Sequence, residues 1–186
     1  MSLKSTADRY GRMGIALHWT SAAALVLAFA AGLAATNAPA AGAAPILLAH
    51  IGLGLVVLLL TLLRIGWWMF ADRRPALPKD QPRWQQRLAQ LVHGALYLAI
   101  LVMGASGIGT LVLSGVVPHL LAGDPVPDLS SLVPRVTHGL VSRLMLALLA
   151  LHIGAALYHQ FVRRDHLLAR MGVGSANERP GVAARP

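Results

Sequence analysis

Residues 46–70 read ILLAHIGLGLVVLLLTLLRIGWWMF, and His50 and Arg64 are the only ionisable side chains among them. A helix needs about 20 apolar residues to cross the hydrocarbon core of a bilayer, which is about 30 Å thick. This run is long enough to do so. Three further apolar runs lie at about 13–35, 88–117 and 136–162. The sequence therefore predicts an all-α integral membrane protein built as a four-helix bundle.

The composition agrees with that prediction. Hydrophobic residues make up 56% of the chain and charged residues 12%, whereas a soluble domain has about twice that charged fraction. There is no cysteine, which excludes disulfides, thiolate metal sites and iron–sulfur clusters. We expect residues 1–170 to form one transmembrane domain, because the four runs leave no room for a second. Residues 171–186 are rich in Gly, Ala and Pro, and we expect a disordered tail.

The net charge of +9 is concentrated in the N-terminal flank, between the second and third runs, and in the tail. These basic residues are Lys4, Arg9, Arg12, Arg73, Arg74, Lys79, Arg83, Arg87, Arg163, Arg164, Arg170, Arg179 and Arg185. The other two connections contain only Arg135. Because cytoplasmic flanks collect Lys and Arg, both termini and the middle connection are expected in the cytoplasm. The charge thus reflects the membrane, and we expect no nucleic-acid partner.

The first run has one alternative interpretation. A basic start, an apolar stretch and Ala38-Pro39-Ala40 superficially fit a secretory signal with its cleavage site. The run is longer than a usual signal, however, and it carries His18 and Trp19 near its start. These features favour a membrane helix.

Six of the eight histidines lie within the apolar runs or at their ends, where an ionisable group is costly and usually functional. They are His18, His50, His93, His138, His152 and His159. Positions 138 and 152 are 14 residues apart. On a helix this spacing gives a rise of ~21 Å and returns the side chains to within ~40° of the same face. The fourth helix can therefore present one ligand near each membrane face.

Depth along the helices suggests partners for these two side chains. His50 lies just inside the outer end of the second run, at a depth comparable to that of His138. Counting back along the first run places His18 ~20 Å further inward than His50, which matches the level of His152. The predicted pairs are His50 with His138 and His18 with His152.

His159 competes with His152, because it is seven residues further along on nearly the same face. It would lie ~31 Å from His138, out in the membrane interface, and we therefore favour His152. His93, near the inner end of the third run, has no outer counterpart on that helix. His93 and His159 are both candidates for contact with a cofactor edge or a quinone.

Two histidine pairs in an apolar bundle favour haem. Zinc usually takes four protein ligands, or three with water, and no Cys, Asp or Glu in the runs completes such a set. Haem needs only two axial ligands, and its porphyrin fills apolar space between helices. The absence of Cys-x-x-Cys-His excludes covalent attachment. We expect two haems of b type with His18, His50, His138 and His152 as axial ligands to iron.

Arginines within the runs need a counter-charge, since an unpaired guanidinium at mid-helix costs at least ~2.5 kcal/mol. Arg64 lies near the inner face. Its charge is explained equally well by snorkelling to the membrane interface and by contact with a propionate or a quinone. Arg143 is a candidate for pairing with a haem propionate. Together with Arg135 it is also a candidate for drawing an anion to the outer face. The tryptophans at 19, 67, 68 and 84 are expected to form an interfacial belt.

Four stretches carry a family resemblance: RMGIALHW at 12–19, HIGLGLVVLLL at 50–60, HGALY at 93–97 followed by GASG at 104–107, and LHIGAALYHQFVRRD at 151–165. They resemble the bacterial cytochrome b561 family of four-helix dihaem membrane cytochromes. The resemblance covers nearly the whole chain. It implies a multi-pass protein of the bacterial inner membrane that exchanges electrons with ubiquinone or another quinone. One departure is Gly139 after His138, where related proteins often carry Glu.

No acid–base pair, nucleophile or nucleotide motif is visible, so no catalytic side chain is assigned and any reaction is carried by the haems. The resemblance implies an oxidoreductase that takes electrons from superoxide and reduces quinone without a partner. The first alternative is the cytochrome subunit of a membrane dehydrogenase, which exchanges electrons between a partner protein and quinone. The second is a non-haem metal or proton carrier that uses the histidines.

Overall fold

The computed structural model describes residues 2–76 and 81–174. Within these ranges the chain is all-helical and contains no strand, which confirms the predicted fold class. The long helices are α1 (Arg12–Asn37), α2 (Ala40–Gly66), α3 (Arg83–Ser114) and α5 (Val133–Leu157). The short elements are the π-helical turns η1 (Trp67–Ala71) and η2 (Tyr158–Arg163), helix α4 (Val117–Ala122) and the 3-10 helix η3 (Leu167–Met171). Four segments are long and apolar enough to cross a membrane.

Helices α2, α3 and α5 begin before the predicted residues 46, 88 and 136, at Ala40, Arg83 and Val133. Helix α2 begins at Ala40, so Pro45 lies inside the helix instead of before it. Pro45 is the sixth residue of the helix, so it removes the hydrogen bond that an amide at this position would donate to the carbonyl of residue 41. The third helix ends at Ser114, before the predicted residue 117, because Gly115 takes a left-handed conformation with φ of 60°. The separate helix α4 follows, which the apolar pattern did not predict.

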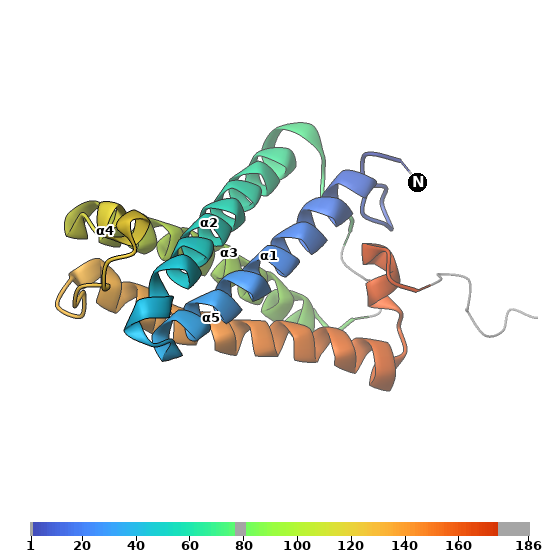
Figure 1. The fold of residues 1–186 in the computed structure, drawn as a ribbon. Coiled ribbons are helices and arrows are strands. Elements are labelled where there is room, and N and C mark those ends of the chain that lie inside the picture. The colour runs from blue at the N-terminus through green and yellow to red at the C-terminus, as the bar shows by residue number, and fades with distance from the viewer. Residues whose placement is uncertain (1, 77–80, 175–186) are drawn as a thin grey trace, which may run out of the picture.

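The long helices form two hairpins, α1 with α2 and α3 with α5 (Figure 1). On α1 the buried residues Gly14, Ser21, Ala24 and Ala28 recur at helical spacing, and such small residues let two membrane helices approach closely. Contact between the hairpins runs mainly through α2 and α3, whereas α5 makes few close backbone contacts with α1 or α2. The hairpins therefore leave space for side chains or a cofactor between α5 and the first hairpin.

Helix α4 packs against the start of α2 at one end of the bundle. Val116 and Leu120 are almost completely buried there against Ala44, with Leu47 and Ile51 beside them. This small cluster holds the connection between α3 and α5 against the turn that joins α1 to α2. It closes the end of the bundle that the charge distribution assigns to the outer face.

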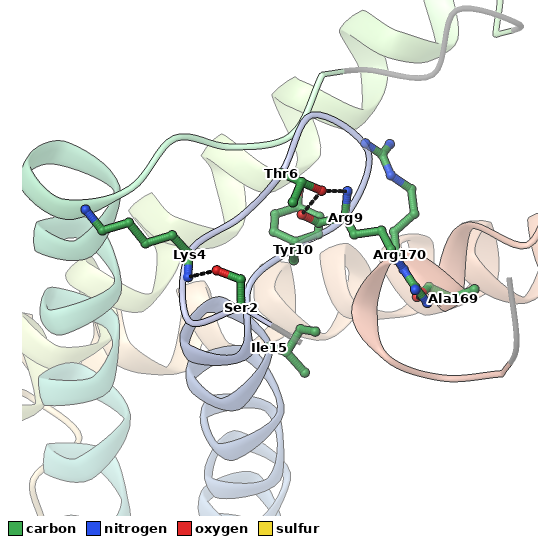
Figure 2. Close-up of a pocket in the computed structure, with 8 residues that line it drawn as sticks. All are labelled: Ser2, Lys4, Thr6, Arg9, Tyr10, Ile15, Ala169 and Arg170. Carbon is green, nitrogen blue, oxygen red and sulfur yellow. Dashed lines mark hydrogen bonds between the residues drawn. The ribbon is translucent and has the colours of Figure 1, made fainter.

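At the opposite end, the N-terminal segment, the start of α1 and η3 line a cavity of about 150 Å³ (Figure 2), and the α2–α3 connection joins them through Arg170. The guanidinium of Arg170 donates to the carbonyls of Asp8 at 2.8 Å and Ala76 at 2.6 Å. Trp19 donates from its indole to the carbonyl of Met171 at 2.9 Å. The N-terminal segment, the α2–α3 connection and η3 contact one another here, and we call this group of segments the inner cap. The start of the expected tail is part of it. Residues 175–186 of that tail lie outside the described residues.

Asp72 is the hydrogen-bonding centre of the same cap. Its carboxylate accepts from the Ser5 amide at 2.9 Å, the Ser5 hydroxyl at 2.8 Å and the Trp67 indole at 3.3 Å. Burial acts to raise the pKa of Asp72, but these bonds and one from the Arg73 amide outweigh it and lower the pKa. The indoles of Trp19 and Trp67 therefore donate hydrogen bonds within the protein. The sequence predicted only an interfacial belt for these residues.

Candidate functional site

The rings of His50 on α2 and His138 on α5 face each other at one level of the bundle. Their centroids are 6.0 Å apart and their planes are nearly perpendicular, at 81°. His50 Nδ1 donates to the carbonyl of Ala28 at 2.7 Å. His138 Nδ1 lies 3.1 Å from the carbonyl of Met103 and 3.2 Å from the Ser106 hydroxyl. With Nδ1 occupied on both rings, each Nε2 is free to act as a metal ligand.

The rings of His18 on α1 and His152 on α5 lie near the other end. Their centroids are 6.3 Å apart, with an interplanar angle of 69°. His93 on α3 joins them, 5.0 Å from His152, and its Nδ1 donates to the carbonyl of Ala89 at 2.6 Å. His18 Nδ1 is buried without a hydrogen-bond partner. The structure thus brings together the residues of both predicted pairs and adds a third histidine at the inner level.

Ring spacing distinguishes the contacts of His152. A metal–imidazole bond is about 2 Å, and a ring nitrogen lies roughly 1 Å from the ring centre, so two rings on opposite sides of one ion have centroids roughly 6 Å apart. The separations for His50–His138 and His18–His152 fit this value. The 5.0 Å between His93 and His152 is shorter than this opposite-side spacing. His93 accordingly lies beside His152.

The helices behind these pairs are widely spaced. Each pair joins α5 to the first hairpin, yet α5 makes few close backbone contacts with α1 or α2. The only fully buried residue of α5 is Met145. Within the described residues, no three His, Asp or Glu side chains are placed to hold a metal ion. The residues present therefore fit a flat apolar cofactor with two axial ligands better than a bare ion.

His159 lies apart from the inner pair. Its Nδ1 is 2.5 Å from the carboxylate of Asp165, which also pairs with Arg163 at 3.5 Å. The turn η2 carries His159 and ends where Arg164 adopts a positive φ of 55°. This local ion cluster engages one ring nitrogen of His159 and fixes it at the helix end.

The predicted arginine sites fall at two levels. Arg64 stacks on the Tyr97 ring, with its guanidinium carbon 5.5 Å from the centroid. At the outer level the Arg135 side chain extends along α5 toward Gly139, where an added Cβ would lie 3.4 Å from its guanidinium. Arg143 is exposed on α5. Arg135 is the cation nearest to His138 in the sequence, three residues before it.

Sequence reasoning missed Arg74 and the role of Tyr97. Arg74 appeared only as one of many cytoplasmic charges, yet its guanidinium lies 5.7 Å from the centroid of Tyr97 and 5.9 Å from that of Trp68. Tyr97 is four residues after His93 and so lies on the same helix face. That spacing was the one signal in the sequence that placed Tyr97 near the histidines.

Four membrane-length helices with facing histidine pairs define the class of b-type membrane cytochromes. Residues 9–174 match the prokaryotic cytochrome b561 family, and the chain belongs to that family. It is a multi-pass membrane protein of electron transfer, and its family implies haem b.

Similar proteins span almost the same length. One is "Cytochrome b561 homolog 1" of Escherichia coli K12, 27% identical, with 88% of this chain and 97% of that protein covered. "Cytochrome b562" of Cereibacter sphaeroides is 30% identical, with 87% and 94% covered. "Probable superoxide oxidase CybB" of Yersinia pestis is 26% identical, with 88% and 95% covered.

Proposed function

We propose that the protein holds two b haems and passes electrons between the outer membrane face and quinone. The observation that carries this proposal is the pair of ring contacts, His50–His138 and His18–His152, joining α5 to the first hairpin at two levels. His50 and His138 would hold the outer haem, and His18 and His152 the inner. Each bound haem supplies a one-electron redox centre.

The chain's own residues prepare both sites. The carbonyl of Ala28 holds the His50 Nδ1 proton and so presents Nε2 as the ligand atom. Met103 and Ser106 orient His138 in the same way. The two α5 ligands are ~21 Å apart along the helix axis, so one rigid helix sets the distance between the two redox centres.

For the reaction we propose superoxide as donor and ubiquinone or another quinone as acceptor, in the bacterial inner membrane. Two superoxide ions release two electrons and two O₂, and quinone takes up both electrons with two protons to give quinol. The printed name of the Yersinia relative supports this donor, as does Arg135, a positive charge three residues before His138 on α5. The alternative is a dehydrogenase subunit that receives electrons from a partner protein. Family membership disfavours a non-haem carrier.

The donor is tested on the purified protein with a superoxide-generating system, a soluble quinone and no partner. We expect haem reduction followed by quinol formation. Replacing Arg135 and Arg143 together by Gln should slow haem reduction about tenfold at low ionic strength, and the loss should shrink as salt rises, because these charges attract the superoxide anion. Stopped-flow absorbance at several salt concentrations measures both effects.

Arg12→Gln is the matched control, since it removes one exposed positive charge from the opposite end of the bundle. It should leave the rate unchanged. Equal rates for the double variant and the native protein, with both haems retained, would argue against steering by these arginines. Absence of superoxide-driven reduction in the native protein would favour the dehydrogenase-subunit alternative.

The orientation rests on the distribution of Lys and Arg, and it has its own test. A reporter that is active only in the cytoplasm should work when fused after Pro186 and fail when inserted in the 118–134 connection. A reporter that is active only outside should behave in the opposite way. The reverse pattern would place the His50–His138 level at the cytoplasmic face and remove the proposed access of superoxide to it.

A further inference from the structure

Two arginines share one aromatic ring at the inner end of the bundle. Arg64 comes from α2, Arg74 from the connection after η1, and Tyr97 from α3. The guanidinium carbons lie 5.5 Å and 5.7 Å from the Tyr97 centroid, and Trp68 also contacts Arg74, at 5.9 Å. Three chain segments thus converge on one ring, and Arg74 acts on Arg64 as a like charge, which a nearby anion would offset.

No protein carboxylate among the described residues supplies that anion. The nearest carboxylate in sequence, Asp72, accepts hydrogen bonds from Ser5, Trp67 and the Arg73 amide. It forms no ion pair with either arginine. Arg64 Nε is buried without a hydrogen-bond partner. A buried donor on a permanently charged group is costly when it is left unpaired.

The arginine pair lies at the level of the inner histidines. Tyr97, whose ring contacts both guanidinium groups, follows His93 by one helical turn on α3, and the His93 ring lies 5.0 Å from that of His152. A haem of b type carries two propionate carboxylates, and a guanidinium is the side chain best suited to bind a carboxylate through paired N–H donors. The missing anion therefore has the same chemistry as the edge of the cofactor proposed for this level.

We propose that Arg64 and Arg74, held against Tyr97, bind the propionates of the inner haem and raise its reduction potential. This inference rests on the proposed ligation of that haem by His18 and His152. A nearby positive charge favours the reduced haem, because reduction adds one negative charge to the site. The arginine pair would make the inner haem the stronger electron acceptor and so direct electrons inward from the outer haem.

The test is a redox titration of the purified, fully loaded protein, with the two haems resolved as two one-electron components. The inner component is the one that His152→Ala removes. In Arg74→Gln we expect the reduced-to-oxidised ratio of the inner component at fixed potential to fall about tenfold. This corresponds to a negative shift of about 59 mV in its reduction potential. The reduction potential of the outer component should not change. Arg74→Lys keeps the charge and should restore most of the native potential.

Arg73→Gln is the matched control, because Arg73 and Arg74 are both exposed and Arg73→Gln removes an equivalent charge while the contact of Arg74 with Tyr97 stays in place. It should shift neither component. An Arg74→Gln protein with native potentials, or one that matches Arg73→Gln, would overturn the propionate assignment, and so would an equal shift of both haems. Two haems retained in His152→Ala would instead show that the proposed ligation itself is wrong.

Discussion

His138→Ala leaves the protein with one haem in place of two, and His152→Ala does the same, each variant losing a different haem. These two histidines are the α5 members of the two ring pairs, at 6.0 Å from His50 and 6.3 Å from His18. Removal of one axial nitrogen leaves the iron without its second protein ligand in an apolar site. Pyridine haemochrome analysis should return about two haems per chain in the native protein and about one in each variant.

His159→Ala and His93→Ala are the matched controls, and both should keep two haems. His159 bonds to Asp165 at the end of α5. The His93 ring lies 5.0 Å from that of His152, closer than two rings on opposite sides of one ion would be. A haem lost in His159→Ala and kept in His152→Ala would move the inner ligand to His159. Loss of the inner haem in His93→Ala would indicate that His93, and not His18, pairs with His152.

Much of this arrangement follows from hydropathy and helical spacing alone. The four apolar runs predicted four membrane helices, because each is long enough to cross a bilayer. The 14-residue interval between His138 and His152 predicted two levels on one helix face. Depth counting then selected His50 and His18, and the structure places each of these rings beside the expected partner.

The parts that sequence reasoning missed depend on contacts between segments that are distant in the chain. The position of Arg74 depends on the turn η1, which brings the chain after α2 back against Tyr97 of α3. The inner cap depends on the carbonyls of Asp8 and Ala76, which both accept from Arg170, and on the Ala76 amide, which donates to the carbonyl of Ala7. Hydropathy reports exposure along one helix and contains no information on such backbone partners.

Gly32→Ala empties most of the outer site, although alanine is the better helix former. Gly32 lies one turn after Ala28 on α1, and a Cβ there would be 2.9 Å from Cε1 and Nδ1 of His50. That distance is well inside the normal contact between carbon atoms. The imidazole must turn away and lose its hydrogen bond to the Ala28 carbonyl, and overpacking of this kind costs about 1–3 kcal/mol. Haem content and the spectrum of the outer haem measure the loss.

Gly52→Ala is the control, two residues after His50 on α2, where a Cβ meets nothing within 4 Å. Both substitutions improve helix propensity by about 1 kcal/mol, so weaker helix formation does not explain a haem deficit in Gly32→Ala. Gly52→Ala should keep two haems. If both variants lose haem equally, the outer site is sensitive to any change in these helices. If Gly32→Ala keeps a native outer haem, the His50 ring is not fixed against α1, and the bond to Ala28 does not set the orientation of this ligand.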